Sequence, residues 1–177
     1  YRENAQMIRS STIEALVNCT TDVQKSIHRL KDMGIELSAV RYRVAVFDMD
    51  IYSGMYQIDM EKQQESALMA FVLFNVSDEI VTREDAGIAY QESGNRVSIL
   101  FQEKWNHNFT RKTREICQEI QEKIKELMGI EVSMGIGSWV KHPEELLISH
   151  SQAEQALQYR YLLGGNLLID MEEQYPV

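Results

Sequence analysis

The sequence predicts a mixed α/β fold, in which helices pack on one central β-sheet and a helical arm precedes it. Stretches of β-branched and apolar residues alternate with segments whose apolar residues recur at helical spacing. The pair Gly94-Asn95 separates two of these strand-like stretches, as a hairpin turn does, because both residues tolerate positive φ. The chain of 177 residues is 44% hydrophobic and 25% charged, which is the composition of an ordinary globular domain.

The helical arm is predicted over residues 1–38. Its second helix, over 22–33, is preceded by the capping-box pair Thr21 and Gln24 and followed by Gly34. The first helix, over 3–19, has a loose apolar stripe made of Met7, Ile8, Ile13, Leu16 and Val17. A sheet domain that already has its own helices offers this stripe no obvious place. We therefore expect the stripe to be buried against a partner; packing back on its own domain is the alternative.

The sheet domain is predicted over residues 39–177. The expected elements are strand 42–47, helix 60–82, strands 87–90 and 96–101, helix 109–127, strand 130–137, a short helix from Pro143, a helix opened by the capping box of Ser151 and Glu154, and strand 166–170. The first strand, Tyr42-Arg43-Val44-Ala45-Val46-Phe47, is rich in β-branched and apolar residues, which predicts burial on both faces and a central position. Gly135 and Gly137 indicate that another backbone approaches the strand over 130–137 closely. The first six elements have the order of a ferredoxin-like unit, with a mostly antiparallel sheet and helices on one face.

Charge and cysteine content narrow the function classes. The 18 basic and 27 acidic side chains give a net charge of −9, which argues against binding of nucleic acid by this fragment. Two cysteines, Cys19 and Cys117, exclude a disulfide framework and favour the cytoplasm. No stretch has the length of a membrane helix, and a chain that begins with Tyr1 is expected to be a piece of a longer protein.

Two acids follow the first buried strand and are candidate metal ligands. Asp48 and Asp50 form an Asp-x-Asp edge of the kind that holds a divalent cation, although acids also end strands in solvent, and we favour that second interpretation. The four histidines lack the spacing of zinc ligands, and His150 is expected at a surface or capping position. Cys117 is expected to be a small buried apolar side chain.

Two segments resemble the GGDEF domain. The C-terminal third, with Val132-Ser133-Met134-Gly135-Ile136-Gly137, Glu144-Glu145-Leu146-Leu147, Ala153-Glu154-Gln155-Ala156-Leu157 and Gly164-Gly165-Asn166, is similar to the family pattern. The stretch Phe47-Asp48-Met49-Asp50-Ile51-Tyr52 resembles the acidic strand end of the family. The resemblance spans residues 40–170 and implies the sheet fold of nucleotide cyclases.

The signature turn of that family is altered here. The positions that match Gly-Gly-(Asp/Glu)-Glu-Phe are Ser93, Gly94, Asn95, Arg96 and Val97. In the family, one acid of the turn helps to hold a metal and the next assists the chemistry, whereas here these positions are neutral and basic. Residues 52–57, Tyr-Ser-Gly-Met-Tyr-Gln, also depart from the family segment whose Asn binds guanine. We therefore expect a degenerate domain that is not an enzyme and has no cofactor and no metal, with Asp48 and Asp50 as vestiges.

The whole chain is most similar to the middle region of YesN-type response regulators, which are bacterial two-component proteins of the AraC family. PucR/CdaR-type transcription factors carry a comparable domain. This resemblance implies a receiver domain before the fragment, a helix-turn-helix pair behind it, and contacts with both or self-association. The expected role is regulation of transcription through signal transmission. An active cyclase, and a sensor that kept a small-ligand or nucleotide pocket, are the other hypotheses.

Overall fold

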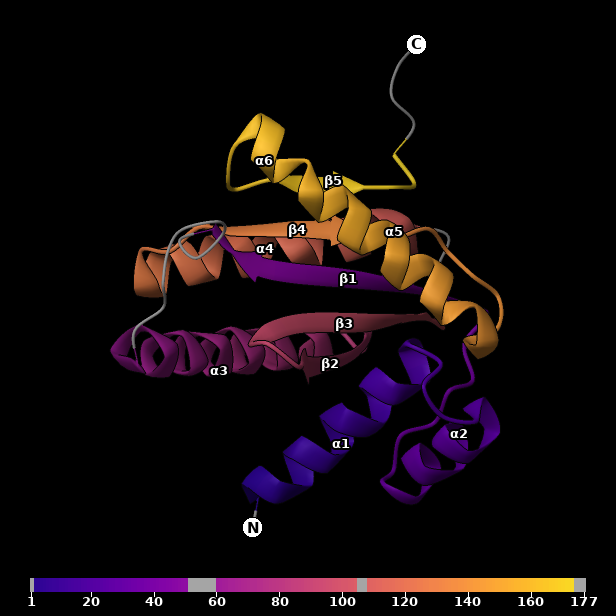
Figure 1. The fold of residues 1–177 in the computed structure, drawn as a ribbon. Coiled ribbons are helices and arrows are strands. Elements are labelled where there is room, and N and C mark those ends of the chain that lie inside the picture. The colour runs from indigo at the N-terminus through magenta and orange to yellow at the C-terminus, as the bar shows by residue number, and fades with distance from the viewer. Residues whose placement is uncertain (1, 51–59, 105–107, 174–177) are drawn as a thin grey trace.

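The computed structural model describes residues 2–50, 60–104 and 108–173. A five-stranded sheet with the strand order β2-β3-β1-β4-β5 forms its centre (Figure 1). The elements, in chain order, are α1 (Arg2–Val17), α2 (Val23–Asp32), β1 (Arg41–Met49), α3 (Met60–Arg83), β2 (Gly87–Glu92), β3 (Arg96–Glu103), α4 (Phe109–Met128), β4 (Val132–Ile136), the short 3-10 helix η2 (Pro143–Glu145), α5 (Leu146–Gln158), α6 (Arg160–Leu163) and β5 (Leu168–Asp170).

The predicted α/β fold and the order of its elements are confirmed. β1 is the central strand and runs antiparallel to β3 and to β4, while β2 and β3 form an antiparallel hairpin. These four strands make the expected ferredoxin-like unit. β5 adds a parallel edge strand beside β4.

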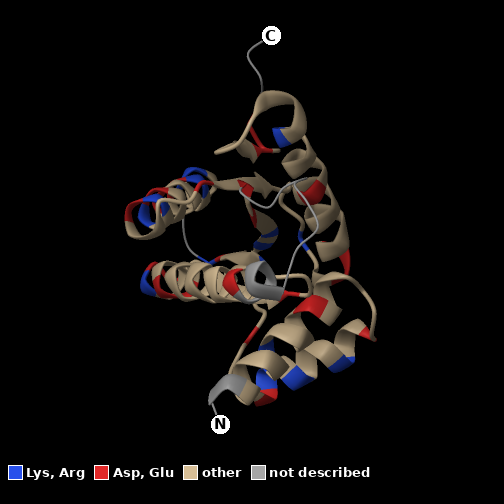
Figure 2. Ribbon diagram, turned by 60° about the vertical axis from the view of Figure 1, so that its left-hand side comes forward, with Lys and Arg blue, Asp and Glu red and all other residues tan. Residues whose placement is uncertain are grey.

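Alternating side chains of β1 contribute to two hydrophobic cores, one on each face of the sheet. Ala45 and Phe47 lie in the core with residues of α3 and α4. Val44 and Val46 lie in the second core with residues of α1, α2 and α5. Helices therefore cover both faces, and Figure 2 shows acidic and basic residues interspersed along them.

The expectation that the arm buries its whole stripe against a partner is wrong. Ile13, Leu16 and Val17 are fully buried in the second core of the same domain. α5 contacts β1 and β4, whereas α1 contacts β2, so the stripe completes the cover of this face. Met7 and Ile8, nearer the start of α1, remain 67% and 58% exposed.

Two predicted helix starts also differ from the structure. α5 begins at Leu146 rather than at Ser151, because its first turns lie against the sheet and the Ser149 hydroxyl accepts a hydrogen bond of 2.9 Å from the Val44 amide. Asp22, rather than Thr21, caps α2, since its carboxylate accepts from the amides of Gln24 and Lys25.

The two glycines of β4 and its end let α5 approach the sheet, as predicted. A Cβ atom on Gly135 would lie 2.1 Å from the Ala153 carbonyl oxygen, and one on Gly137 would lie 1.9 Å from that of Ser149. Both contacts involve backbone, which cannot turn aside as a side chain can. The position of α5 along the sheet therefore depends on these two glycines.

Among the described residues, no helix combines the length and hydrophobicity needed to span a membrane. Cys117 is buried, as predicted, and Cys19 is exposed.

Candidate functional site

Residues 93–97, which we expect to match the signature turn, include the turn of the β2–β3 hairpin and the first two residues of β3. Glu92 pairs with Arg96 across the ladder, so Ser93, Gly94 and Asn95 make a three-residue connection. Gly94 has φ of 82° and Asn95 has φ of 63°, the left-handed conformation that the Gly-Asn pair predicts.

Helix α1 holds one side of this turn. The carboxylate of Glu14 accepts two hydrogen bonds of 2.9 Å from Ser93, one from its amide and one from its hydroxyl. One helical turn earlier, the Ser10 hydroxyl accepts a hydrogen bond of 3.1 Å from the Gln91 amide. The helical arm is thus bonded directly to the segment whose sequence we compared with the signature turn.

Helix α5 holds the other side through charged groups. Arg96 Nη1 lies 2.9 Å from Glu154 Oε2 and 3.9 Å from Glu92 Oε2. The imidazole of His150 lies between the same two carboxylates, with Nε2 2.6 Å from Glu92 Oε1 and Nδ1 3.0 Å from Glu154 Oε1. We call Glu92, Arg96, His150 and Glu154 the turn cluster.

Within the turn cluster, His150 favours the charged form of Glu92, and Glu92 favours the charged form of His150. Burial lowers the pKa of His150, but the hydrogen bond and the charge of Glu92 outweigh it and raise that pKa above its usual 6.5. Burial raises the pKa of Glu92, but the hydrogen bond and the charge of His150 hold that pKa below its usual 4.5. Below the raised pKa of His150, its imidazolium is therefore paired with the carboxylate of Glu92. The Ser98 hydroxyl donates a further hydrogen bond of 2.8 Å to Glu92.

The two candidate metal ligands have separate roles. Asp48 Oδ2 accepts a hydrogen bond of 3.0 Å from Arg160 and lies 3.9 Å from Arg96 Nη2, so it belongs beside the turn cluster. Asp50 accepts hydrogen bonds from the Ser133 hydroxyl at 2.6 Å and from the Asn166 amide at 2.7 Å. It therefore fixes the connection into β5, and a Cβ on the neighbouring Gly165 would come within 2.9 Å of its carboxylate.

In the part of the chain that the structure describes, no group of three or more His, Cys, Asp or Glu side chains is arranged to hold a metal ion. Guanidinium groups are the nearest cations to Asp48 among these residues. Val97, the last position of the altered motif, is buried in the core. The departures from the family pattern at 52–57 lie outside the described residues.

A shallow cleft opens on each side of the turn. The first, of about 400 Å³, lies between α1 and the turn and is lined by Ser10, Glu14, Gln91, Ser93 and Asn95 among others. The second, of about 430 Å³, is lined by Arg96, Glu154, Leu157, Gln158, Arg160 and Tyr161.

Sequence reasoning missed four residues of this site, Glu14, Glu92, His150 and Arg160. His150 is buried inside α5, so the expectation of a surface or capping position is wrong. The spacing of His150 and Glu154 by four residues on one helix was the available signal. No sequence pattern around Glu14 or Glu92 indicates their roles, because Glu14 bonds to Ser93 and Glu92 to His150, which are distant in the sequence.

The comparisons with known proteins agree with this fold. A family model for the GGDEF-like domain matches residues 20–159. The chain belongs to the GGDEF-like domain family. No curated protein matches it.

Two solved structures resemble this GGDEF-like domain. One contains the coiled coil and GGDEF domain of DgcB from Caulobacter crescentus in complex with c-di-GMP, at 18% identity and a TM-score of 0.56, covering 82% of this chain and 75% of that chain. The other is the active GGEEF domain of a diguanylate cyclase from Vibrio cholerae, at 14% identity and a TM-score of 0.57, covering 83% and 90%.

These matches correct the expectation that the chain is not an enzyme. The fold is one that diguanylate cyclases use, and the Vibrio cholerae domain is described as active. Asn95 and Arg96 at the signature positions led to that expectation, but the fold and the family point to a family of enzymes.

Proposed function

We propose that this GGDEF-like domain is a regulatory, signal-transmitting domain of a bacterial two-component response regulator, in which α1 passes a displacement to the β2–β3 turn. The bonds between Glu14 and Ser93 carry this proposal. They attach the N-terminal helix to the turn that aligns with the family's signature. A receiver domain before α1 and an AraC-type DNA-binding region behind the domain are the proposed neighbours in a cytoplasmic protein.

Two further observations support a mechanical role for α1. Its C-terminal half is fixed in the core through Ile13, Leu16 and Val17, while Met7 and Ile8 expose apolar surface nearer its start. A helix that is anchored at one end and open to a partner at the other can transmit a shift along its axis. The exposed half is the proposed contact with a receiver or with a second copy of the chain.

The test uses the full-length regulator with Glu14→Gln, Ser93→Ala and both together. Ser93→Ala removes the hydroxyl bond and keeps the amide bond, whereas Glu14→Gln removes the charge and one of the two acceptor oxygens. We expect each variant to weaken the effect of phosphorylation on DNA binding, and their effects in the double variant not to add fully, because both weaken one shared contact. Ser11→Ala, at an exposed position of α1, is the matched control. Unchanged phosphorylation dependence in Glu14→Gln, with an unchanged free energy of unfolding, would contradict the proposal.

A second candidate function is sensing of a nucleotide in the cleft beside Arg96 and Arg160. The side chain of Arg160 is only 8% exposed, and among the described residues its Nε and Nη1 atoms have no hydrogen-bond partner. Nη2 pairs with Asp48 and Nη1 lies 4.0 Å from Asp50 Oδ1, so two acids already face this charge. The donors without a hydrogen-bond partner are what would contact an anionic group of a nucleotide. Thermal unfolding with GTP, GDP and c-di-GMP tests this candidate: a ligand at one hundred times its Kd stabilises the fold by about 2.7 kcal/mol. No shift with any of the three at millimolar concentration would exclude it.

A further inference from the structure

A fully buried arginine lies near the start of the central strand. Arg43 has no exposed surface and projects from the same face of β1 as Ala45 and Phe47, which are core residues. Placing a charge in such a position is costly unless it is paired and hydrogen-bonded. The partners of Arg43 therefore indicate what this charge is for.

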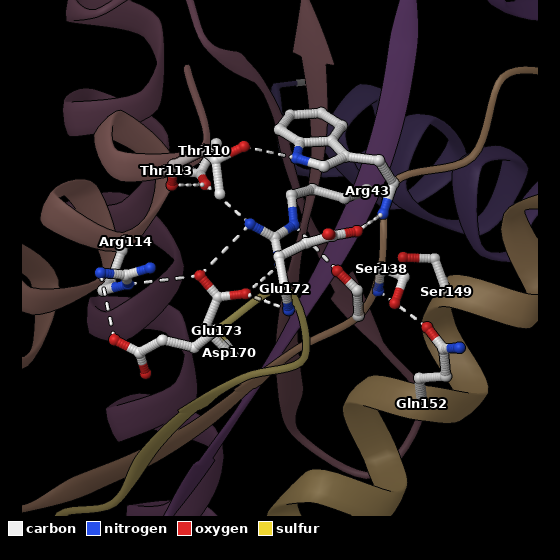
Figure 3. Close-up of polar contacts among 12 residues, drawn as sticks. Arg43, Thr110, Thr113, Arg114, Ser138, Ser149, Gln152, Asp170, Glu172 and Glu173 are labelled. Atoms are coloured by element: carbon white, nitrogen blue, oxygen red, sulfur yellow. Dashed lines mark hydrogen bonds and ion pairs between the residues drawn. The ribbon is translucent and has the colours of Figure 1, made fainter. Parts of the chain in front are cut away.

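The guanidinium of Arg43 is bonded on every side (Figure 3). Nε donates to the Gly137 carbonyl oxygen at 2.8 Å, and Nη1 donates to the Thr113 hydroxyl at 3.2 Å. Nη2 forms an ion pair with the carboxylate of Asp170, and the ring of Trp139 lies 5.2 Å from the guanidinium carbon. Among the described residues, the carboxylate that pairs with it is that of Asp170, the last residue of β5.

The chain around Asp170 is held mainly by polar contacts. Asp170 also accepts hydrogen bonds from Arg114 Nε at 3.3 Å and from the Glu172 amide at 2.9 Å. Glu172 accepts a hydrogen bond of 2.8 Å from the Trp139 amide, and Glu173 lies 3.1 Å from Arg114 Nη1.

Apolar burial adds little to this attachment. Ile169 is buried, but Leu168 is half-buried and Met171 is exposed. β5 is an edge strand that pairs with β4 alone. Its release would break the short ladder that pairs Leu168, Ile169 and Asp170 with β4, together with the bond of 2.9 Å from the Met171 amide to the Ile136 carbonyl.

We propose that residues 168–173 form a C-terminal latch, which docks on the sheet and leaves it as one unit, with Arg43 as the buried counter-charge. In proteins, replacing a buried ion pair with apolar side chains of similar volume is often neutral or stabilising, so stability alone does not account for this pair. The ion pair of Arg43 and Asp170 favours one docked position of residues 168–173, because in any other position the buried charge of Arg43 would lose its carboxylate partner. Docking of the latch sets the direction in which the chain leaves the sheet. The inference concerns the end of the chain opposite α1 and does not depend on the proposed function.

Native-state hydrogen exchange of the whole chain tests the latch. The Met171 amide reports on docking, and the Gly137 amide, bonded to the Val44 carbonyl at 2.8 Å, reports on the sheet. In the unmodified protein, Met171 is expected to exchange through an opening that depends less on denaturant than the opening at Gly137. Equal denaturant dependence at the two amides would overturn the proposal.

The substitution Asp170→Asn removes the counter-charge. We expect protection of Met171 to fall at least about tenfold while that of Gly137 changes much less. The pair Arg43→Met with Asp170→Leu is expected to restore protection at Met171, and Glu126→Gln, at an exposed position of α4 outside the latch, to change it little. An equal loss at both amides in Asp170→Asn, or no loss at Met171, would overturn the latch. Should Asp170→Asn fail to fold, the denaturant dependence of the unmodified protein decides.

Discussion

Replacing His150 with Gln should change how the stability of this domain depends on pH. His150 lies in a buried position between Glu92 and Glu154, and Arg96 from β3 contacts the same two acids. The pKa of His150 is raised in the folded state by the hydrogen bond and charge of Glu92, against the lowering effect of burial. The folded protein therefore holds a proton at pH values where the unfolded chain has released it.

The sign of the effect follows from this difference. A raised pKa in the folded state contributes stability that is fully present below the unfolded value of 6.5 and is lost as pH rises through the folded value. In that window the folded state binds one proton more than the unfolded chain. The free energy of unfolding should then fall by at most about 1.4 kcal/mol per pH unit.

At pH 6, where the pair is charged, His150→Gln should cost about 1–3 kcal/mol. The loss is limited because Ser98 and Arg96 still contact Glu92 after the imidazole is gone. Above the folded pKa of His150, the substitution should cost less. The difference should equal the free energy of unfolding that the unmodified protein has lost between pH 6 and that pH.

Urea denaturation at intervals from pH 5.5 to 9 measures this slope, and NMR titration of the His150 ring protons measures its pKa. His28→Gln is the control, because His28 is exposed on α2 and should leave the slope unchanged. A His150 pKa below 6.5, or the same slope in His150→Gln as in the unmodified protein, would refute the reasoning.

Two further predictions concern the interior. Gly137→Ala should lower the free energy of unfolding by about 2–4 kcal/mol in urea denaturation, because its Cβ would lie 1.9 Å from the Ser149 carbonyl oxygen. Gly94 has φ of 82°, and a Cβ added there meets no other atom within 4 Å. Gly94→Ala should therefore cost only about 1 kcal/mol of the same free energy. A smaller loss for Gly137→Ala than for Gly94→Ala would contradict the role of close approach. Burial raises the pKa of the Cys117 thiol, so a thiol reagent at pH 8 should label exposed Cys19 at once and Cys117 only after unfolding. Equal labelling rates at the two cysteines would contradict this.

The sequence by itself determined the order of the elements and the centre of the sheet. Strand β1 is apolar on both faces from Val44 to Phe47, and a strand covered on both sides satisfies that pattern. The Gly94-Asn95 turn and the close approach at Gly135 and Gly137 were also predictable, because each depends on the residue's own backbone freedom or small size.

Only the tertiary structure decided what these elements contact. The stripe of α1 has the same pattern whether it packs on a partner or on its own sheet. His150 pairs with Glu92 across 58 residues, and Arg43 pairs with Asp170 across 127. Helical and strand periodicity arise from neighbouring residues, whereas the partner of a buried charge depends on which distant segments the fold brings together. For that reason the strand Arg41–Met49 could be placed from its sequence, while the counter-charge of its buried Arg43 could not.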